Sequence, residues 1–555
     1  MKKYLIALSL VGLVTTSCYE KLNITPPNSI TNEQVLKLLE TADDKTIVTI
    51  MGAMADALPG QINGGGYDQW GNQYVSNFAG QLCCKDFTGN DVVVGKEPPT
   101  GDLGNFYAGL GVRDYTSGMN YPYWKRGYTM IGAANKVTDL LTDELLAKNS
   151  SKMLREYKGR ALLIRAFGYN YLIENYQDSY LQGGKDKPGV PIYVHFSNSQ
   201  PLVARSSVKV VYDSIIKWTK TAISLYEEAG VGYTKGDADA WRDIDMGVAK
   251  YILARAALNM GDYATTIAAC NDILVEYPTL IAEEDYVARN LQTPETNPVN
   301  WKIVPEYRAE NLALLKLAKN PEVLLGWENT KYSTFGAQVN WFNFYGEMRI
   351  DDRLYKQIDP RDFRRDNFLD ATEYGPFVSP TYYKSYVEDP SSVQPAMLAS
   401  YLNFKWASTV GINGTYGSLQ ADQWRSGATD VCFIRTSEVL LMKAEAEAQS
   451  GGDWKTTLNK LLAARTKSSK TVMTCDDYAG SLGKSPLEQV QLQWRIEMWG
   501  EVGIEWYNNR RWNLPVNRQG STIHHNPAMT YSVASMTLQI PEQEINTNNL
   551  IVQNP

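Results

Sequence analysis

Apolar residues recur at three- and four-residue steps over residues 152–177, which predicts a long helix. The recurring positions are Leu154, Tyr157, Ala161, Leu162, Tyr169, Leu172 and Tyr176, and the charged Arg165 falls on the same spacing. A second helix is predicted at about 207–229, and a shorter one begins near Thr31, whose hydroxyl can cap it. The apolar face of this shorter helix comprises Val35, Leu38 and Leu39. The pattern therefore predicts a mainly α protein.

Two stretches of the chain repeat one design, a helix, a tight turn and a second helix. They are residues 245–278 and 437–467, with turns Gly261-Asp262-Tyr263 and Gly452-Asp453-Trp454. Small residues precede each turn, so the paired helices can approach closely. This pattern is typical of tetratricopeptide-like units. Two units are fewer than a solenoid needs, so we expect further helices, including one at 486–512, to complete the scaffold.

Other stretches are rich in Gly, Pro, Asn and aromatic residues and predict loops. Long insertions of this kind are commonly functional. We therefore expect one domain in which helices give support and loops give recognition. The expected scaffold covers about 31–60, 150–278 and 433–512, and the expected ligand-binding part covers about 61–130 and 279–432.

The first residues have the layout of an export signal. Lys2 and Lys3 precede an apolar run, and Thr15-Thr16-Ser17 then places small residues directly before Cys18. Small residues that end in Cys are the form read by the bacterial lipoprotein pathway. We expect residues 1–17 to be a signal peptide and Cys18 to become the lipidated N-terminus of the mature chain, held on a membrane outside the cytoplasm. The alternative is an ordinary signal peptide with a Cys near its cleavage point.

Composition narrows the classes of function. The net charge is −7 over 555 residues, and no Lys/Arg stripe is visible, which disfavours a nucleic-acid partner. His195, His524 and His525 are the only histidines, and no metal-ligand spacing accompanies them. Carboxylate pairs such as Asp351-Asp352 and Glu445/Glu447 occur by chance among 61 acidic residues. We interpret the glutamates as solvent-facing or paired with Arg, and we find no positive sign of catalysis.

The aromatic content is high, with 14 Trp, 35 Tyr and 13 Phe. Tyr and Trp combine an apolar face with a polar tip, which suits a wet binding surface. Two clusters of aromatic and amide side chains are candidates for ligand binding: Tyr67, Trp70, Asn72 and Tyr74, and Trp341, Asn343 and Tyr345. Their rings would stack on a sugar ring or on apolar peptide side chains. The alternative is that these rings only pack loops onto the scaffold.

Several short motifs, in this order, resemble those of the RagB/SusD family of surface lipoproteins. They are Arg160–Tyr169, Gly189–Ile192, Arg205–Val208, Val211–Ile215, Asn320–Leu324, Asp359–Asp362, Ile434–Ala446, Ile540–Asn546 with Asn549, and the terminal Gln553-Asn554-Pro555. The chain departs from the family pattern at Glu505 and Asn508, where the family has Arg and Asp. It also departs at Gly500–Gly503, which is one residue longer than usual.

The resemblance implies a non-enzymatic binding protein with four tetratricopeptide-like units and no cofactor. Such a protein is anchored on the outer membrane, binds a glycan and passes it to a SusC-like TonB-dependent barrel. Regions that resemble the family's glycan platform correspond loosely to residues 64–78 and 327–345. Three alternatives stay open at this point: peptide cargo of the RagB type, a surface glycoside hydrolase with two carboxylates at the cleft floor, and a scaffold that binds protein only.

Overall fold

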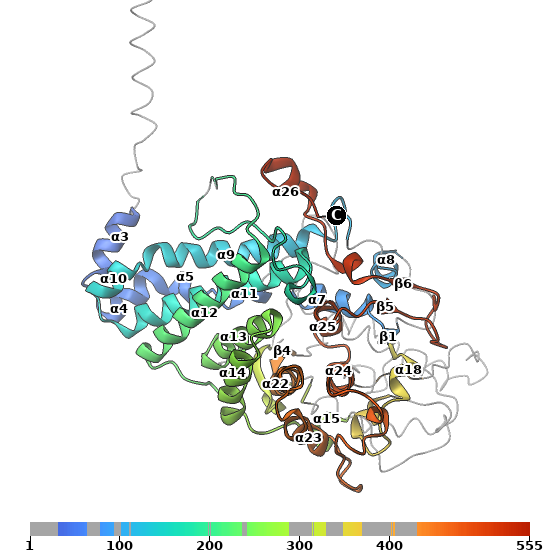
Figure 1. The fold of residues 1–555 in the computed structure, drawn as a ribbon. Coiled ribbons are helices and arrows are strands. Elements are labelled where there is room, and N and C mark those ends of the chain that lie inside the picture. The colour runs from blue at the N-terminus through green and yellow to red at the C-terminus, as the bar shows by residue number, and fades with distance from the viewer. Residues whose placement is uncertain are drawn as a thin grey trace, which may run out of the picture.

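The fold is seen in a computed structural model (Figure 1). It describes residues 31–63, 78–93, 101–109, 113–197, 199, 201–235, 241–287, 313–314, 316–328, 348–368, 401, 403, 405 and 430–554. Helices dominate these residues, as predicted, and the strands are short. No helix among them is both long enough and apolar enough to cross a membrane.

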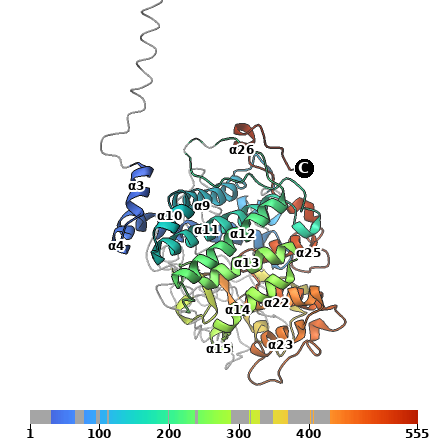
Figure 2. The same cartoon turned by 60° about the vertical axis from the view of Figure 1, so that its left-hand side comes forward.

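A stack of antiparallel helices forms the scaffold (Figures 1 and 2). Its members are α9 (Tyr121–Leu140), α11 (Lys152–Tyr176), α12 (Val208–Ala229), α13 (Met246–Met260), α14 (Tyr263–Glu276), α22 (Thr436–Ser450), α23 (Trp454–Ala464) and α24 (Pro486–Glu497). Each helix packs on the one before it, except that α24 packs on α22. The stack thus continues from α14 to α22 across an insertion of more than 150 residues, and this matches a tetratricopeptide-like scaffold.

Both predicted repeat units are present, with one change at the second turn. In the first unit Gly261 adopts a φ of 78° and Asp262 caps α14 by accepting the amide N–H of Thr265. In the second unit the left-handed residue is Gly451, at a φ of 76°, one position before the predicted Gly-Asp-Trp turn. The extra Gly452 precedes the capping Asp453. Each turn therefore uses a glycine C-cap followed by an Asp N-cap.

The other α-helices in the described part of the chain flank this stack. They are α3 (Asn32–Leu39), α4 (Asp44–Ile47), α5 (Ala53–Ala55), α6 (Gly60–Asn63), α7 (Phe78–Phe87), α8 (Gly101–Tyr107), α10 (Asp143–Lys148), α15 (Glu283–Tyr286), α18 (Asp352–Tyr355), α25 (Ile504–Trp512) and α26 (Glu542–Thr547). Thr31 and Gln34 form a capping box at α3, which confirms the predicted start. Leu39 is buried, but Leu38 is 52% exposed, so the predicted apolar face of α3 is narrower than expected.

Two predictions differ from the structure in helix boundaries. Residues 486–512 form two helices, because Gly500, Val502 and Gly503 between α24 and α25 all have positive φ. Helices α7 and the first half of α9 lie within the stretch expected to be loop-rich. Glycines and aromatic residues weaken the apolar periodicity of α9, although 11 of its 20 residues are buried.

Glycines allow the helices of the stack to cross closely. A Cβ added at Gly127 of α9 would lie 2.4 Å from Cγ of Leu172 on α11. A Cβ at Gly168 of α11 would lie 3.0 Å from the carbonyl oxygen of Gly127. Both values are below ordinary van der Waals contact, so this crossing requires glycine on each helix.

Several of the family-like motifs meet in one buried ion cluster rather than at a surface. Glu322, Asp362 and Arg435 come from three of these motifs, and their partners in the cluster are Arg364, Lys405, Arg465, Glu497 and Glu501. Arg435 contacts Glu322 at 2.8 Å and Glu497 at 2.6 Å. The four basic and four acidic side chains balance in charge, which lets the core hold them.

The chain terminus is held by two other motifs. The Asn554 amide donates to the carbonyl oxygen of Tyr176 at 2.6 Å, at the end of α11. Arg205 donates to the Asn554 side-chain oxygen at 2.7 Å and to the Gly189 carbonyl oxygen at 2.6 Å. These motifs therefore join the C-terminus to the scaffold.

Candidate ligand-binding site

The predicted site residues lie outside the described part of the chain. These are Tyr67, Trp70, Asn72, Tyr74, Trp341, Asn343, Tyr345 and the lipidation residue Cys18. Their roles stay predictions. The structure does describe the residues at which the two aromatic segments, 64–77 and 329–347, join the rest of the protein.

The middle insertion leaves and re-enters the scaffold at one small sheet. Strand β2 (Val323–Trp327) pairs antiparallel with β4 (Val431–Arg435), and Trp327 lies opposite Val431. The Trp327 ring is partly buried, with the Arg242 guanidinium 4.7 Å above its centre. Although more than 100 residues separate these strands in sequence, their ends lie side by side.

The early aromatic segment ends at the same sheet. Its next residue is Phe78, the first of α7, whose ring centre lies 5.2 Å from that of Phe433 on β4. The ring of Phe78 also lies 5.5 Å from Tyr171 on α11. Aromatic packing of this kind fixes the end of segment 64–77 against the strand that closes the middle insertion.

A second small sheet holds the end of segment 329–347. Met348 follows this segment, and its carbonyl oxygen accepts from the backbone and side-chain amides of Asn403 at 3.1 and 2.8 Å. The next residues form β3 (Arg349–Ile350), which pairs antiparallel with β1 (Val92–Val93), shortly after α7. Both aromatic segments are thus attached to neighbouring parts of one body.

Glu505, one of the departures from the family pattern, holds the turn before β1. Its carboxylate accepts the backbone N–H of Asn90 at 2.6 Å and of Asp91 at 3.2 Å. Burial, aided by the charge of Asp91, raises the pKa of Glu505 to about 7. A Cβ at Gly89 would lie 2.2 Å from this carboxylate, so glycine there makes room for it.

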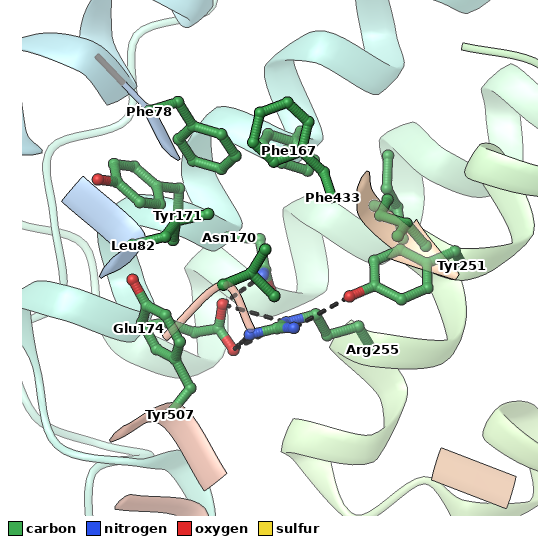
Figure 3. A pocket seen from close by; sticks show the side chains of 13 residues that line it. Phe78, Leu82, Phe167, Asn170, Tyr171, Glu174, Tyr251, Arg255, Phe433 and Tyr507 are labelled. Atoms are coloured by element: carbon green, nitrogen blue, oxygen red, sulfur yellow. Dashed lines mark hydrogen bonds and ion pairs between the residues drawn. The ribbon is translucent and has the colours of Figure 1, made fainter. Parts of the chain in front are cut away.

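A pocket opens beside Phe78 and Phe433 (Figure 3). It has about 570 Å³ of unfilled space, counting the part open to solvent. Among the described residues, six aromatic side chains line it: Phe78 of α7, Phe167 and Tyr171 of α11, Tyr251 of α13, Phe433 of β4 and Tyr507 of α25. Most of its lining is apolar, as in small-molecule sites.

An ion pair forms the polar side of this pocket (Figure 3). Glu174 of α11 and Arg255 of α13 approach to 3.1 Å, and both are largely buried. Burial opposes the charge of Arg255, but Glu174, Tyr251 and Glu438 outweigh it and raise the Arg255 pKa well above its usual value. This arginine therefore stays charged in the pocket.

The pocket residues were not among the predicted site residues. Their signal in the sequence was the helical spacing of Phe167, Asn170, Tyr171 and Glu174 on α11, which also fits an ordinary core face. Only the placement of α7, β4 and α25 against this face turns it into a pocket.

The carboxylate pairs considered for catalysis are held in ion pairs. Asp351 contacts Arg353 at 2.7 Å and Asp352 contacts Lys356 at 2.6 Å. Glu445 is buried and contacts Arg511 at 2.8 Å, so the interpretation that it pairs with Arg is confirmed. Among the residues that the structure describes, no group of three His, Cys, Asp or Glu side chains is placed to hold a metal ion.

Comparisons with known proteins give one consistent answer. A family model described as "Starch-binding associating with outer membrane" matches residues 106–230, and the SusD family model matches residues 327–555. Together these matches cover more than half of the chain. No curated protein matches it in sequence.

Solved structures share the fold over almost the whole chain. A SusD superfamily protein from Bacteroides vulgatus has a TM-score of 0.64 at 18% identity, over 92% of this chain and 98% of that one. A putative sugar binding protein from the same species has 0.62 at 21%, over 92% and 98%. Surface glycan-binding protein A from Bacteroides thetaiotaomicron, solved with laminarihexaose, has 0.60 at 14%, over 92% and 99%.

The family motifs of the sequence, the tetratricopeptide-like stack and both family models agree, and the chain belongs to the RagB/SusD family.

Proposed function

We propose that this protein is a lipid-anchored outer-membrane protein that binds an oligosaccharide or polysaccharide and passes it to a SusC-like TonB-dependent transporter. Its role is binding without catalysis. One observation carries the glycan site: the ends of segments 64–77 and 329–347 join neighbouring parts of one body through Phe78, Phe433 and the β1–β3 pair. A single ligand surface built from both aromatic clusters requires this arrangement.

The relatives support the same chemistry. One matching family model is described as starch-binding and associated with the outer membrane, and one solved structure of the same fold holds laminarihexaose. The signal layout that ends at Cys18 fits an anchor at that membrane. Neighbouring Trp and Tyr rings would stack on the apolar faces of sugars, while Asn72 and Asn343 would bind hydroxyls.

Affinity gel electrophoresis tests glycan binding directly. The chain without residues 1–18 is run through native gels that contain single polysaccharides, including a β-1,3-glucan because of the laminarihexaose-bound relative. We expect retardation by at least one glycan and its relief by Trp70→Ala. Tyr115→Ala serves as the control, because Tyr115 is also an exposed aromatic (40% exposed) but belongs to neither cluster.

No retardation by any glycan would contradict glycan binding by the isolated chain. Peptide cargo of the RagB type would then be the next function to test, with a panel of oligopeptides. Release of shorter sugars from a retained polysaccharide would instead contradict the proposal of binding without catalysis.

A further inference from the structure

The aromatic pocket contains one buried polar atom without a partner. Asn170 is 8% exposed, and its side-chain nitrogen donates to Glu174 at 2.7 Å. The amide cannot be turned over, because the carboxylate of Glu174 only accepts hydrogen bonds. Asn170 Oδ1 therefore stays the acceptor, and it has no hydrogen-bond partner among the described residues. An unsatisfied buried acceptor of this kind is energetically unfavourable.

The other polar side chains that line the pocket in the described part of the chain are already engaged. Glu174 accepts from Arg255 and, at 2.9 Å, from Asn259. The hydroxyl of Tyr171 donates to Gln81 at 2.6 Å, and that of Tyr251 donates to Glu438 at 2.7 Å. The pocket thus offers a ligand one buried acceptor and many apolar ring surfaces (Figure 3).

This inventory disfavours a sugar ring in the pocket and favours an aromatic one. A sugar ring carries several hydroxyls, and most of them would be buried here without a partner, which is costly. A planar aromatic ring with a single donor at its edge satisfies Asn170 Oδ1 and presents only apolar surface to the phenyl rings. Phe78 already packs edge to face against Phe167 and Tyr171. The ring of an aromatic ligand would add one more member to this cluster.

We propose that this pocket binds a small planar aromatic group with one hydrogen-bond donor, such as an indole or a phenol, with its N–H or O–H directed at Asn170 Oδ1. The site differs from the aromatic segments assigned to glycan, so the proposal does not rest on the proposed function. It adds a second class of ligand to the same chain.

Calorimetric titration of indole into the chain without residues 1–18 tests the proposal. We expect saturable binding at one site, and binding of 1-methylindole, which lacks the N–H, at least about fivefold weaker, because one hydrogen bond contributes about 1 kcal/mol. Equal affinities, or no saturable binding of indole or phenol up to their solubility limits, would overturn the proposal.

The aromatic group could belong to a peptide side chain or to a free small molecule, and titration with a peptide distinguishes these two sources. Binding of the tripeptide Gly-Trp-Gly, with the same dependence on the indole N–H, would assign the group to a peptide side chain. Binding of free indole without the tripeptide would assign it to a free small molecule. Either result supports the pocket chemistry.

Two asparagines give a matched pair of variants. Asn170→Ala removes the acceptor, so the preference for indole over 1-methylindole should disappear. Asn259→Ala removes the other amide that donates to Glu174 but leaves Asn170 in place, so the preference should remain. Because the readout is a ratio measured within one protein, an overall loss of stability does not imitate it. A preference kept in Asn170→Ala would overturn the assignment.

Discussion

Single residues in this protein are explained mainly by what they hold in place. Glu322, Asp362 and Arg435 belong to recognisable motifs, yet all three are buried in the ion cluster. The motifs are visible in the sequence but their role is not, because pairing between residues 322 and 435 depends on the β2–β4 register. The reverse holds for the candidate glycan-binding residues. Their residue types predict which contacts they make with a sugar, and those contacts stay a prediction.

Glu497 is the central acid of the ion cluster. Its carboxylate forms ion pairs with Arg364, Arg435 and Arg465, at 2.9, 2.6 and 2.9 Å. Burial alone would raise its pKa, but these arginines outweigh it and hold the Glu497 pKa well below its usual value. We expect Glu497→Gln to destabilise the fold by about 3–5 kcal/mol, because it leaves buried positive charge uncompensated.

Chemical denaturation measures this change. Glu144→Gln is the control, since the Glu144 side chain is 79% exposed and its ion pair with Lys148 lies at the surface; its effect should stay below about 0.5 kcal/mol. Equal midpoints for the two variants would show that the buried cluster does not contribute as described.

Glu505 gives the fold a dependence on pH. The folded chain keeps the Glu505 proton up to a pKa of about 7, whereas the unfolded chain loses it near 4.5. The folded state therefore binds more protons between these values, and the Glu505 contribution to stability falls as pH rises from about 4.5 to about 7. We expect the melting temperature of Glu505→Gln to fall less between pH 4.5 and 7 than that of the wild type.

Thermal unfolding at several pH values checks the Glu505 prediction. Glu228→Gln is the matched control, because the Glu228 side chain is 53% exposed. The same change in melting temperature between pH 4.5 and 7 in wild type and in Glu505→Gln would contradict a raised pKa at this residue.

At the level of elements, helices with strong periodicity were predictable and those built on glycine were not. Helices α11 to α14 and the two repeat turns follow from apolar spacing and from Gly-Asp caps. Helix α9 was missed because Gly127 and Gly132 interrupt its pattern, although Gly127 has a packing reason that only the contact with Leu172 reveals. The break between α24 and α25 likewise depends on backbone angles at Gly500–Gly503.

The two glycines of α9 predict opposite responses to alanine. Gly127→Ala places a methyl group 2.4 Å from Leu172, so we expect a loss of about 1–3 kcal/mol from overpacking. Gly132→Ala meets nothing within 4 Å, so the better helix propensity of alanine should stabilise the fold by up to about 1 kcal/mol. Circular dichroism melts of both variants test this; changes of the same sign would contradict the described α9–α11 crossing.

At the scale of the whole molecule, a helical stack supports an insertion whose ends meet at one sheet. The sequence predicted this division, because the two repeat units flank a long Pro-, Asn- and aromatic-rich tract. It could not predict that Trp327 and Val431 would be neighbours or that Phe78 would pack on Phe433. Long-range pairings of this kind leave no local pattern in the sequence.

The anchor at Cys18 is a prediction about the whole molecule on its membrane. Cys18→Ala should release the protein from the outer membrane and leave its melting temperature unchanged, because it removes the acylation site and alters no residue of the described core. Membrane fractionation of cells that lack the partner barrel measures this. Unchanged association with the membrane in those cells would contradict a lipid anchor at Cys18.

If segments 64–77 and 329–347 form one glycan surface, residues of both must contribute to the affinity for one ligand. Calorimetric titration into wild type, Trp70→Ala and Trp341→Ala, with a glycan that retards the protein in the gels, measures this. We expect each variant to weaken binding by about 1–3 kcal/mol, as stacked aromatic residues do elsewhere, with no fall in melting temperature. A loss of affinity in only one variant, or in neither, would contradict a shared surface.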